Sequence, residues 1–302
     1  MRPAVRADER HTTRPYLKVR KAYVDVLDAG RRKNLMHGLL QVDVTEARRL
    51  LARSAGGRPP LSFTGWVLHC VATAVDANRI VHAYRRRNRL VLFDDVDVSA
   101  QIEVELAGQK AVKPVIVRAA NLKSVRQVSD EVRAARHEHP GDERRYRATV
   151  AYVSLPRFLR RLGERLVMTD PRVVKRLGGT VGLSSVGMFG TGGGWGLVAA
   201  PPTLMVVVGG ISTQPRLIDG RLQDRQFLHL TLSFDHAIVD GAPAARFAAR
   251  LTELIETADG LDPAAAADIA PAAGTESDRR MPHRAANGRL AVPTSGDHRR
   301  AG

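Results

Sequence analysis

Apolar and polar positions follow two different periods along the middle of the chain, which predicts a mixture of strands and helices. Residues 228–234 alternate strictly, with three leucines and Phe234 on one side and His229, Thr231 and Ser233 on the other. This is the pattern of a strand that turns one face inward. Residues 203–211 are apolar almost throughout and follow a Pro-Pro pair, which predicts a fully buried strand.

The same two periods recur in other segments. Strand patterns cover residues 90–93, 98–106, 111–117 and 180–186, and helical spacing covers residues 44–55, 63–75, 122–137, 155–166 and 244–258. Because proline has no amide hydrogen, Pro114 places the strand over 111–117 at a sheet edge or a strand end. Strands and helices do not strictly alternate, so we expect an α/β (α+β) mixed-sheet sandwich rather than a doubly wound parallel sheet.

The ends of the chain differ from its middle in composition. Residues 1–34 are polar and basic, and we expect a partly disordered basic N-terminal arm there. Residues 259–302 contain almost no large apolar side chain and show no period, which predicts a disordered tail. No repeat and no Gly/Ser linker divides the middle, so residues 35–258 are expected to form one domain.

The charge of the chain raises the question of nucleic-acid binding. Its 302 residues include 47 Lys and Arg against 31 Asp and Glu, a formal net charge of +16. Arginine accounts for 40 of the 47 basic residues, and Ala, Val and Gly are also abundant, which indicates a general compositional bias. The basic residues are dispersed and are not interleaved with aromatic side chains. We therefore expect no nucleic-acid partner, and a pocket for an anionic cofactor explains part of the charge equally well.

Cysteine content and hydropathy indicate the cellular compartment in which the protein works. Cys70 is the single cysteine, so neither an internal disulfide nor a cysteine zinc site can form, and we expect a reducing compartment and no metal. No segment approaches the roughly 18 consecutive apolar residues of a membrane span. The N-terminus lacks the apolar core of a signal peptide. We expect a cytoplasmic protein with no membrane contact.

One candidate for chemistry is the segment LTLSFDHAIVDGAPAARF, residues 230–247. His236 follows the predicted strand directly and precedes a helix that begins near Pro243. Histidine can take up a proton near neutral pH, and a strand end can hold it rigidly. Asp240 lies four residues further on and could order the loop, although a simple helix cap explains it too. His229, on the polar side of the strand, is expected to be a surface or crevice residue.

The second candidate is the glycine-rich stretch GGTVGLSSVGMFGTGGGWGLVAAPP, residues 178–202. It lacks the lysine of a phosphate-binding loop and does not fit the dinucleotide fingerprint. Ser184 or Ser185, at the end of a strand, could instead donate a hydrogen bond to a developing oxyanion. Neither lies in a Gly-x-Ser-x-Gly turn, which argues against a hydrolase nucleophile. Three larger side chains nearby could line a site or pack in the core: Met188, Phe189 and Trp195.

These motifs resemble those of a known family. LSFDHAIVDGAPAARF is similar to the signature of the 2-oxoacid dehydrogenase acyltransferases, the dihydrolipoamide acyltransferase cores, whose fold is shared with chloramphenicol acetyltransferase. GTVGLSSVGMFG, VAAPPTLMVVVGG and KPVIVRAANLKSVRQVSDEV resemble further family segments in the same order, and the similarity spans residues 35–257.

The resemblance implies a function and a role for each motif residue. It implies a single catalytic domain that transfers an acyl group between coenzyme A and a thiol acceptor, with acyl-CoA as substrate and lipoamide carried on a separate protein. His236 matches the catalytic base, Ser184 the serine that stabilises the oxyanion, with Ser185 as its neighbour, and Asp240 the aspartate that orders the histidine loop. It also implies a homotrimer with the active site between subunits, and partners among dehydrogenase-complex components.

The chain departs from the family pattern in ways that leave an alternative open. Ala237 follows the histidine where the family commonly has arginine, and we find no lipoyl domain or subunit-binding module in the sequence. A non-catalytic trimeric scaffold descended from the same family is therefore the alternative hypothesis.

Overall fold

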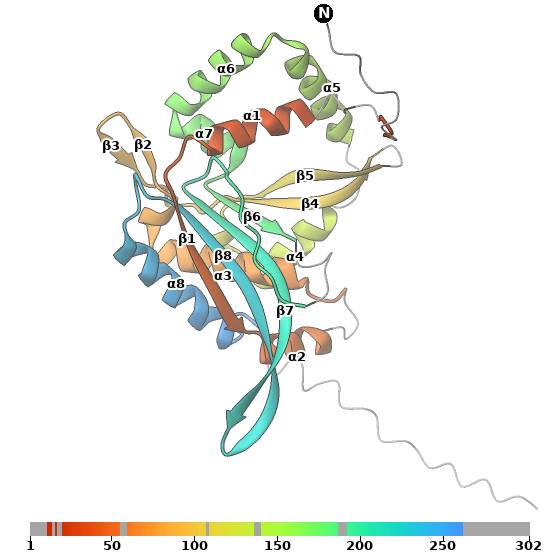
Figure 1. The fold of residues 1–302 in the computed structure, drawn as a ribbon, viewed down its shortest axis with the longest axis vertical. Coiled ribbons are helices and arrows are strands. Elements are labelled where there is room, and N and C mark those ends of the chain that lie inside the picture. The colour runs from red at the N-terminus through yellow and green to blue at the C-terminus, as the bar shows by residue number, and fades with distance from the viewer. Residues whose placement is uncertain are drawn as a thin grey trace, which may run out of the picture. The chain divides into compact units, whose positions relative to one another are not determined.

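The strands form one mixed six-stranded sheet and a separate two-stranded ribbon. The computed structural model describes residues 11–13, 16, 20–54, 59–106, 109–135, 140–186 and 192–261. The large sheet has the order β1-β8-β7-β6-β4-β5 (Figure 1), with strands β1 (Leu35–Asp43), β4 (Val98–Leu106), β5 (Gln109–Val117), β6 (Val181–Ser185), β7 (Leu204–Ile218) and β8 (Arg221–Asp235). The ribbon pairs β2 (Tyr84–Arg86) with β3 (Arg89–Val91). β6 pairs in parallel with β4 and β7, and the other pairs are antiparallel, so the predicted mixed-sheet sandwich is confirmed.

Helices lie against one face of the sheet and gather at one of its ends (Figure 1). α3 (Phe63–Ala77) and α8 (Gly241–Glu256) lie against one face, where Trp66, Phe234 and Phe247 are almost fully buried (Figure 1). Two further helices are α2 (Thr45–Arg53) and α4 (Val125–Ala134). The remaining helices gather at one end of the sheet, at the top of Figure 1: α1 (Arg20–Gly30), α5 (Pro140–Ser154), α6 (Arg157–Thr169) and α7 (Pro171–Gly178). Single 3-10 turns span Arg79–His82 (η1) and Ala120–Leu122 (η2). No helix in the described ranges is long and apolar enough to cross a membrane.

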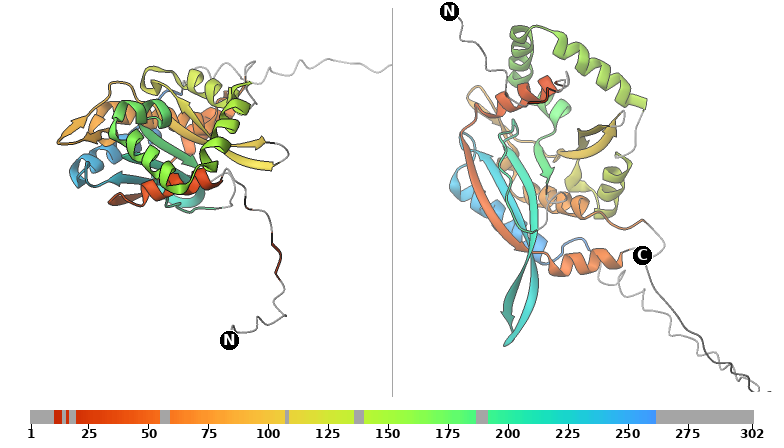
Figure 2. Two further views of the ribbon diagram at one scale, coloured as in Figure 1. Left: turned by 90° about the horizontal axis from the view of Figure 1, so that it is seen from above. Right: turned by 45° about the vertical axis from the view of Figure 1, so that its right-hand side comes forward.

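The strands agree best with the sequence pattern where one face is apolar. The predicted strand over 98–106 coincides with β4, and Pro114 lies on β5 at the edge of the sheet, as expected. β7 and β8 are each 15 residues long, so both extend well beyond the predicted ranges. The added length is a polar hairpin that projects past the rest of the sheet (Figure 2), and its exposed residues carry no alternating apolar face.

Helix α1 lies inside the segment for which the composition predicts an arm. It buries Asp25, Ala29 and Gly30 rather than a stripe of large apolar residues. Asp25 accepts hydrogen bonds from Arg160 of α6, with its Oδ2 2.8 Å from Nε. Because an ion pair rather than an apolar stripe attaches α1, hydrophobic periodicity could not reveal this helix.

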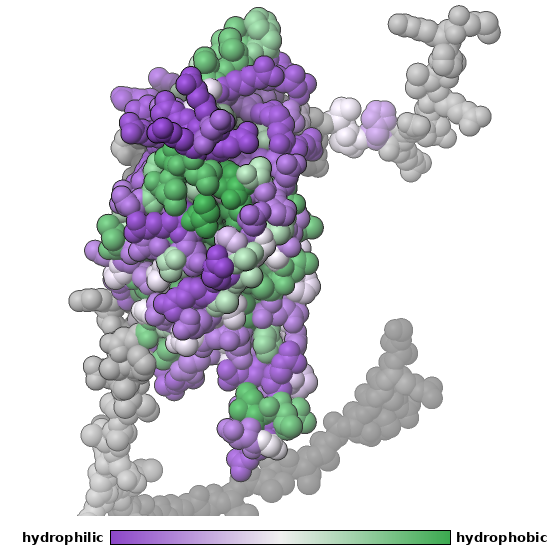
Figure 3. Space-filling model, turned by 90° about the vertical axis from the view of Figure 1, so that its left-hand side faces the viewer, coloured by the Kyte–Doolittle hydropathy of each residue, from purple (hydrophilic) through white to green (hydrophobic). Residues whose placement is uncertain are grey.

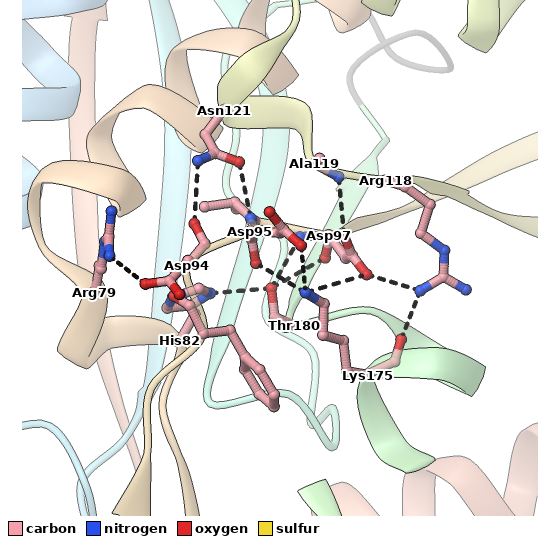
Figure 4. Close-up of polar contacts among 12 residues, drawn as sticks. Arg79, His82, Asp94, Asp95, Asp97, Arg118, Ala119, Asn121, Lys175 and Thr180 are labelled. Carbon is pink, nitrogen blue, oxygen red and sulfur yellow. Dashed lines mark hydrogen bonds and ion pairs between the residues drawn. The ribbon is translucent and has the colours of Figure 1, made fainter. Parts of the chain in front are cut away.

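Asp97, just before β4, is bonded to the end of β5 through its carboxylate and to the start of β6 through its backbone carbonyl (Figure 4). Asp97 is 3% exposed, and its Oδ2 lies 2.8 Å from Arg118 Nη1, while its Oδ1 accepts the backbone N–H of Ala119 at 2.9 Å. The Asp97 carbonyl accepts the backbone N–H groups of Thr180 and Val181 at 2.7 and 3.1 Å. These bonds fix where β6, the strand that carries Ser184, begins.

His82 completes this network from the 3-10 turn η1. Its Nε2 is 3.2 Å from the Phe93 carbonyl, and its Nδ1 is 3.0 Å from Thr180 Oγ1. A carbonyl can only accept, so Nε2 carries the proton and the neutral Nδ1 accepts from the Thr180 hydroxyl. Burial lowers the pKa of His82 to about 4, and the fold therefore holds the neutral imidazole.

This environment makes the stability of the protein depend on pH. The unfolded chain protonates His82 near its ordinary pKa of about 6.5, whereas the folded chain resists protonation until about pH 4. The free energy of unfolding should therefore fall as pH drops from 6.5 to 4, by up to about 3 kcal/mol from this group. Urea denaturation at several pH values in this window measures the fall.

His82→Gln supplies the control, because glutamine keeps a donor and an acceptor and does not titrate. Other carboxylates also lose stability in acid, so the difference between the two proteins isolates His82. Parallel stability curves for wild type and variant would contradict the assignment.

Candidate active site

His236 stands at the end of β8, where two neighbouring segments hold the backbone. The backbone N–H of Asp235 bonds the Thr203 carbonyl at 2.9 Å, and that of His236 bonds the Asn34 carbonyl at 2.7 Å. The His236 side chain is 49% exposed. The imidazole is therefore accessible on a backbone that is tied on both sides, as the sequence predicts for a strand-end histidine.

Asp235 shapes the turn that follows, and the sequence reasoning did not single it out. Its Oδ2 lies 2.7 Å from Lys33 Nζ, and its Oδ1 accepts the backbone N–H of Ala237 at 3.2 Å. Its carbonyl accepts the N–H groups of Ile238 and Val239. Ala237 takes part in this turn through its backbone, so replacing its side chain leaves these bonds in place. In the sequence, only the position of Asp235 next to the histidine could have pointed to this role, because its partner Lys33 lies 202 residues away.

Asp240 lies beside His236 and starts α8. Its Oδ1 is 3.7 Å from His236 Nδ1, and its side chain is 86% exposed. The side chain makes no capping hydrogen bond to the helix, whose first bond runs from the Ala244 N–H to the Asp240 carbonyl. The simple helix-cap reading is therefore not what the structure shows. At this distance the carboxylate can attract a protonated imidazole without a direct hydrogen bond.

Ser184 lies on a different part of the sheet. In β6 it stands between Gln101 of β4 and Val207 of β7, and Val207 in turn pairs with Thr231 of β8. Ser184 is half-buried on the face opposite α3 and α8, which we call the polar face, whereas the adjacent Ser185 alternates to the other face.

The register separates the serine from the histidine. Thr231 is five residues before His236, about 17 Å along a strand, and Ser184 is two strands to the side, about 9.5 Å. The two residues are therefore on the order of 19 Å apart within one chain. One chain brings His236 and Asp240 together but not Ser184.

A glycine-rich strap, residues 192–200, crosses the polar face. Gly194 accepts the backbone N–H of Gly210 at 3.1 Å, and the indole N–H of Trp195 bonds the Leu40 carbonyl of β1 at 3.1 Å. A Cβ on Gly209 would lie 2.1 Å from the Gly194 carbonyl oxygen, and one on Gly210 would lie 2.0 Å from that of Gly192. These two glycines of β7 let the backbone of the strap lie directly on the strand, and Gly193 of the strap approaches His229 just as closely, since a Cβ there would lie 2.4 Å from the imidazole Cε1. Met188 and Phe189 lie outside the described residues.

The strap also buries His229, which corrects the expectation of a surface or crevice residue. The imidazole is 5% exposed and lies under the Trp195 ring, with the ring centroids 4.3 Å apart. Its Nε2 is 3.1 Å from Ser212 Oγ and 3.3 Å from Gln41 Nε2. Within the described residues, its Nδ1 and the Thr231 hydroxyl are buried without a hydrogen-bond partner. Burial lowers the pKa of His229, so it is held neutral.

In the part of the chain that the structure describes, no group of three or more His, Cys, Asp or Glu side chains could hold a metal ion. Cys70 is buried in the core, and burial raises the pKa of its thiol far above the usual range.

Comparison with known proteins confirms the resemblance that the motifs carry. Residues 157–261 match the family described as 2-oxoacid dehydrogenases acyltransferase (catalytic domain). A dihydrolipoyllysine-residue succinyltransferase component of the 2-oxoglutarate dehydrogenase complex from Saccharomyces cerevisiae is 33% identical over 79 residues, 26% of this chain and 17% of that protein. The Bos taurus component is 26% identical over 108 residues, 36% of this chain and 24% of that protein. The matched segment thus spans a quarter or less of these relatives.

Solved structures match over a larger part of the chain. A probable dihydrolipoamide acetyltransferase from Listeria monocytogenes superimposes with a TM-score of 0.62 at 19% identity, over 82% of this chain and 96% of that one. The cubic core of the pyruvate dehydrogenase multienzyme complex gives a TM-score of 0.60 at 19% identity, over 84% and 96%. At this identity the superpositions establish the fold, which is that of these catalytic cores.

The close contact between strap and sheet predicts the effect of adding one methyl group. Gly210→Ala should displace the strap and lower the free energy of unfolding by about 1–3 kcal/mol, because the obstructing atom is a backbone oxygen. Of the two tryptophans, Trp66 is fully buried, so a red shift in fluorescence reports Trp195 leaving His229. Gly163→Ala is the matched control, since nothing lies within 4 Å of the added Cβ, and it should stabilise α6 slightly. Unchanged stability and fluorescence in Gly210→Ala would refute the role of the contact.

Proposed function

Residues 157–261 belong to the 2-oxoacid dehydrogenases acyltransferase (catalytic domain) family, and we propose that this chain transfers an acyl group between coenzyme A and a second thiol. The second thiol that fits best is dihydrolipoamide carried on another protein, because the curated relatives are named for acylation of a dihydrolipoyllysine residue. We place the reaction in the cytoplasm, in a catalytic domain that spans residues 35–258.

The proposed reaction begins with proton transfer from the thiol to the imidazole of His236. The thiolate forms a bond to the carbonyl carbon of the acyl thioester, and the carbonyl oxygen becomes an oxyanion. The hydroxyl of Ser184 donates a hydrogen bond to that oxyanion. When the intermediate collapses, the original carbon–sulfur bond breaks and the leaving thiolate takes the proton back from His236. Asp240 attracts the imidazolium that exists between these two transfers.

The observation that supports this proposal most strongly is where the two groups lie. His236 is presented on a tied backbone with an accessible ring, as a general base requires. Ser184 is on the order of 19 Å away in the same chain, which no side-chain rotation can close. We therefore propose that each active site combines Ser184 of one protomer with His236 of its neighbour, in a homotrimer. Assembly with other components of a dehydrogenase complex fits this arrangement.

His236→Ala tests the chemistry. Removing the base should lower thioester exchange between acetyl-CoA and dihydrolipoamide by about 10²–10⁴-fold. Ser184→Ala should lower it by about 10²-fold or more, through the lost oxyanion contact. Steady-state rates with wild-type protein as reference measure both.

His37→Gln is the matched control: the His37 side chain is exposed on the edge strand β1, and glutamine can keep its hydrogen bond to Ser233 Oγ, so the rate should stay close to that of wild type. If wild-type protein binds acyl-CoA in calorimetry but transfers nothing, or if it binds none, the scaffold alternative replaces the enzyme.

The shared site predicts complementation between two inactive variants. Co-expressed His236→Ala and Ser184→Ala chains should recover about one quarter of wild-type activity. In randomly mixed trimers, one interface in four joins an intact His236 to an intact Ser184. Homotrimers of either variant alone are the controls. No recovery in mixed trimers, verified by two affinity tags, would show that the site does not cross the interface.

A further inference from the structure

Helix α6 packs with its charged side toward the protein. Arg160 is 8% exposed and bonds Asp25 of α1 as well as the carbonyls of Val153 and Leu155. Glu164, four residues on, pairs with Arg32. These contacts fix the rotation of the helix about its own axis, because positions four apart lie on one side.

The opposite side of α6 is a continuous apolar stripe in contact with solvent. Leu159, Leu162 and Leu166 follow at spacings of three and four residues, and Phe158 lies four residues before Leu162. Their exposed fractions are Phe158 69%, Leu159 40%, Leu162 53% and Leu166 64%, and Leu155, just before the helix, is 45% exposed. Figure 3 shows apolar surface at the top of the molecule, at the height of α6 in Figure 1, directly above a hydrophilic band. An amphipathic helix in a globular protein normally turns this side inward. The stripe is therefore a surface that some apolar medium or partner covers.

Free arginines border the stripe. Arg161 and Arg165 follow Phe158 and Leu162 by three residues each, so they lie next to the stripe on the helix surface. Both are exposed, and within the described residues neither has an acidic partner. Arg172 of α7 is likewise exposed and unpaired there. The one acidic residue of α6, Glu164, is on the inward side.

Charge complementarity distinguishes between the possible occupants. An isologous contact, in which a second copy packs the same face against this one, would bring two sets of free arginines together, which is repulsive. A head-to-tail contact between copies is distinguished by the sedimentation test below. An anionic lipid surface offers an apolar layer for the stripe and phosphate groups for the arginines. It also needs no shaped groove to receive a protruding phenylalanine and leucines.

We propose that α6 binds the surface of an anionic membrane, with its apolar stripe at the acyl boundary and Arg161 and Arg165 at the headgroups. The sequence-based expectation of no membrane contact considered spanning segments. An interfacial helix needs no such length, since it lies in the plane of the surface. The proposal is independent of the acyl-transfer chemistry, because His236 and Ser184 lie on the sheet.

Vesicle co-sedimentation of the full-length protein tests the proposal. The protein should sediment with vesicles of phosphatidylcholine and phosphatidylglycerol and far less with phosphatidylcholine alone, and binding should weaken as salt rises. Phe158→Gln, Leu162→Gln and Leu166→Gln combined should weaken binding by about tenfold or more. Arg161→Gln with Arg165→Gln should remove the preference for anionic vesicles. These side chains are exposed, so circular dichroism should be unchanged.

The tip of the β7–β8 hairpin provides the matched control. Leu217 and Leu222 are paired across the hairpin and are 73% and 76% exposed, so Leu217→Gln with Leu222→Gln makes the same chemical change elsewhere. This variant should bind vesicles like wild type. The proposal fails if wild type does not bind anionic vesicles, or if the α6 and hairpin variants bind equally. It also fails if the α6 variant changes the sedimentation velocity of lipid-free protein, which would make the stripe a contact between copies.

Discussion

The central constraint in this fold is that residues 227–235 of β8 are buried on both faces and hydrogen-bonded along both edges, to β1 and β7. On one face its leucines and Phe234 enter the core beneath α3 and α8. On the other face, the strap covers His229 and its surroundings. A strand held in this way cannot shift its register without turning every side chain to the wrong side. His236 directly follows this buried part of the strand. Its ring is therefore exposed, while its backbone position is fixed by the pairing of the strand within the sheet.

The same register keeps Ser184 and His236 apart within one chain, so the proposed active site requires an assembly. Ser184 is placed by the parallel pairing of β6 with β4 and β7, and the Asp97 network fixes where that strand begins. His236 is placed by the far end of an antiparallel neighbour. Side chains reach only a few ångströms, so two groups separated by several residues along the strands can cooperate only across an interface. In the proposed mechanism, acyl transfer therefore depends on oligomerisation, and loss of assembly would remove activity without altering either residue.

The sequence predicted those features of the fold that depend on residues close to one another in the chain. The ranges of β4 and α3 followed from apolar periodicity, and His236 and Asp240 were found because four residues separate them in sequence. Lys33 was missed because it meets Asp235 only after folding, and α1 was missed because ion pairs attach it. The burial of His229 depends on the strap. The glycines of the strap indicate a close backbone contact, but the sequence does not show which segment they contact. The prediction that one side of β8 carries polar residues is confirmed, but the prediction that His229 is accessible is wrong. Hydropathy describes the residues of a face and does not show which segment covers that face.

Hydropathy also fails to predict which side of helix α6 is buried. The sequence establishes that one side of α6 is apolar, but the ion pair between Arg160 and Asp25 turns the charged side toward the protein and leaves the apolar side exposed. A buried ion pair yields little net stability once desolvation is counted, whereas each large apolar side chain left in water forgoes roughly 1–2 kcal/mol of burial. A packing that buries the charges and exposes the leucines is therefore unfavourable for an isolated domain in water. It becomes favourable when a second apolar medium receives the stripe, and the arginines at its border identify that medium as one that carries negative charge.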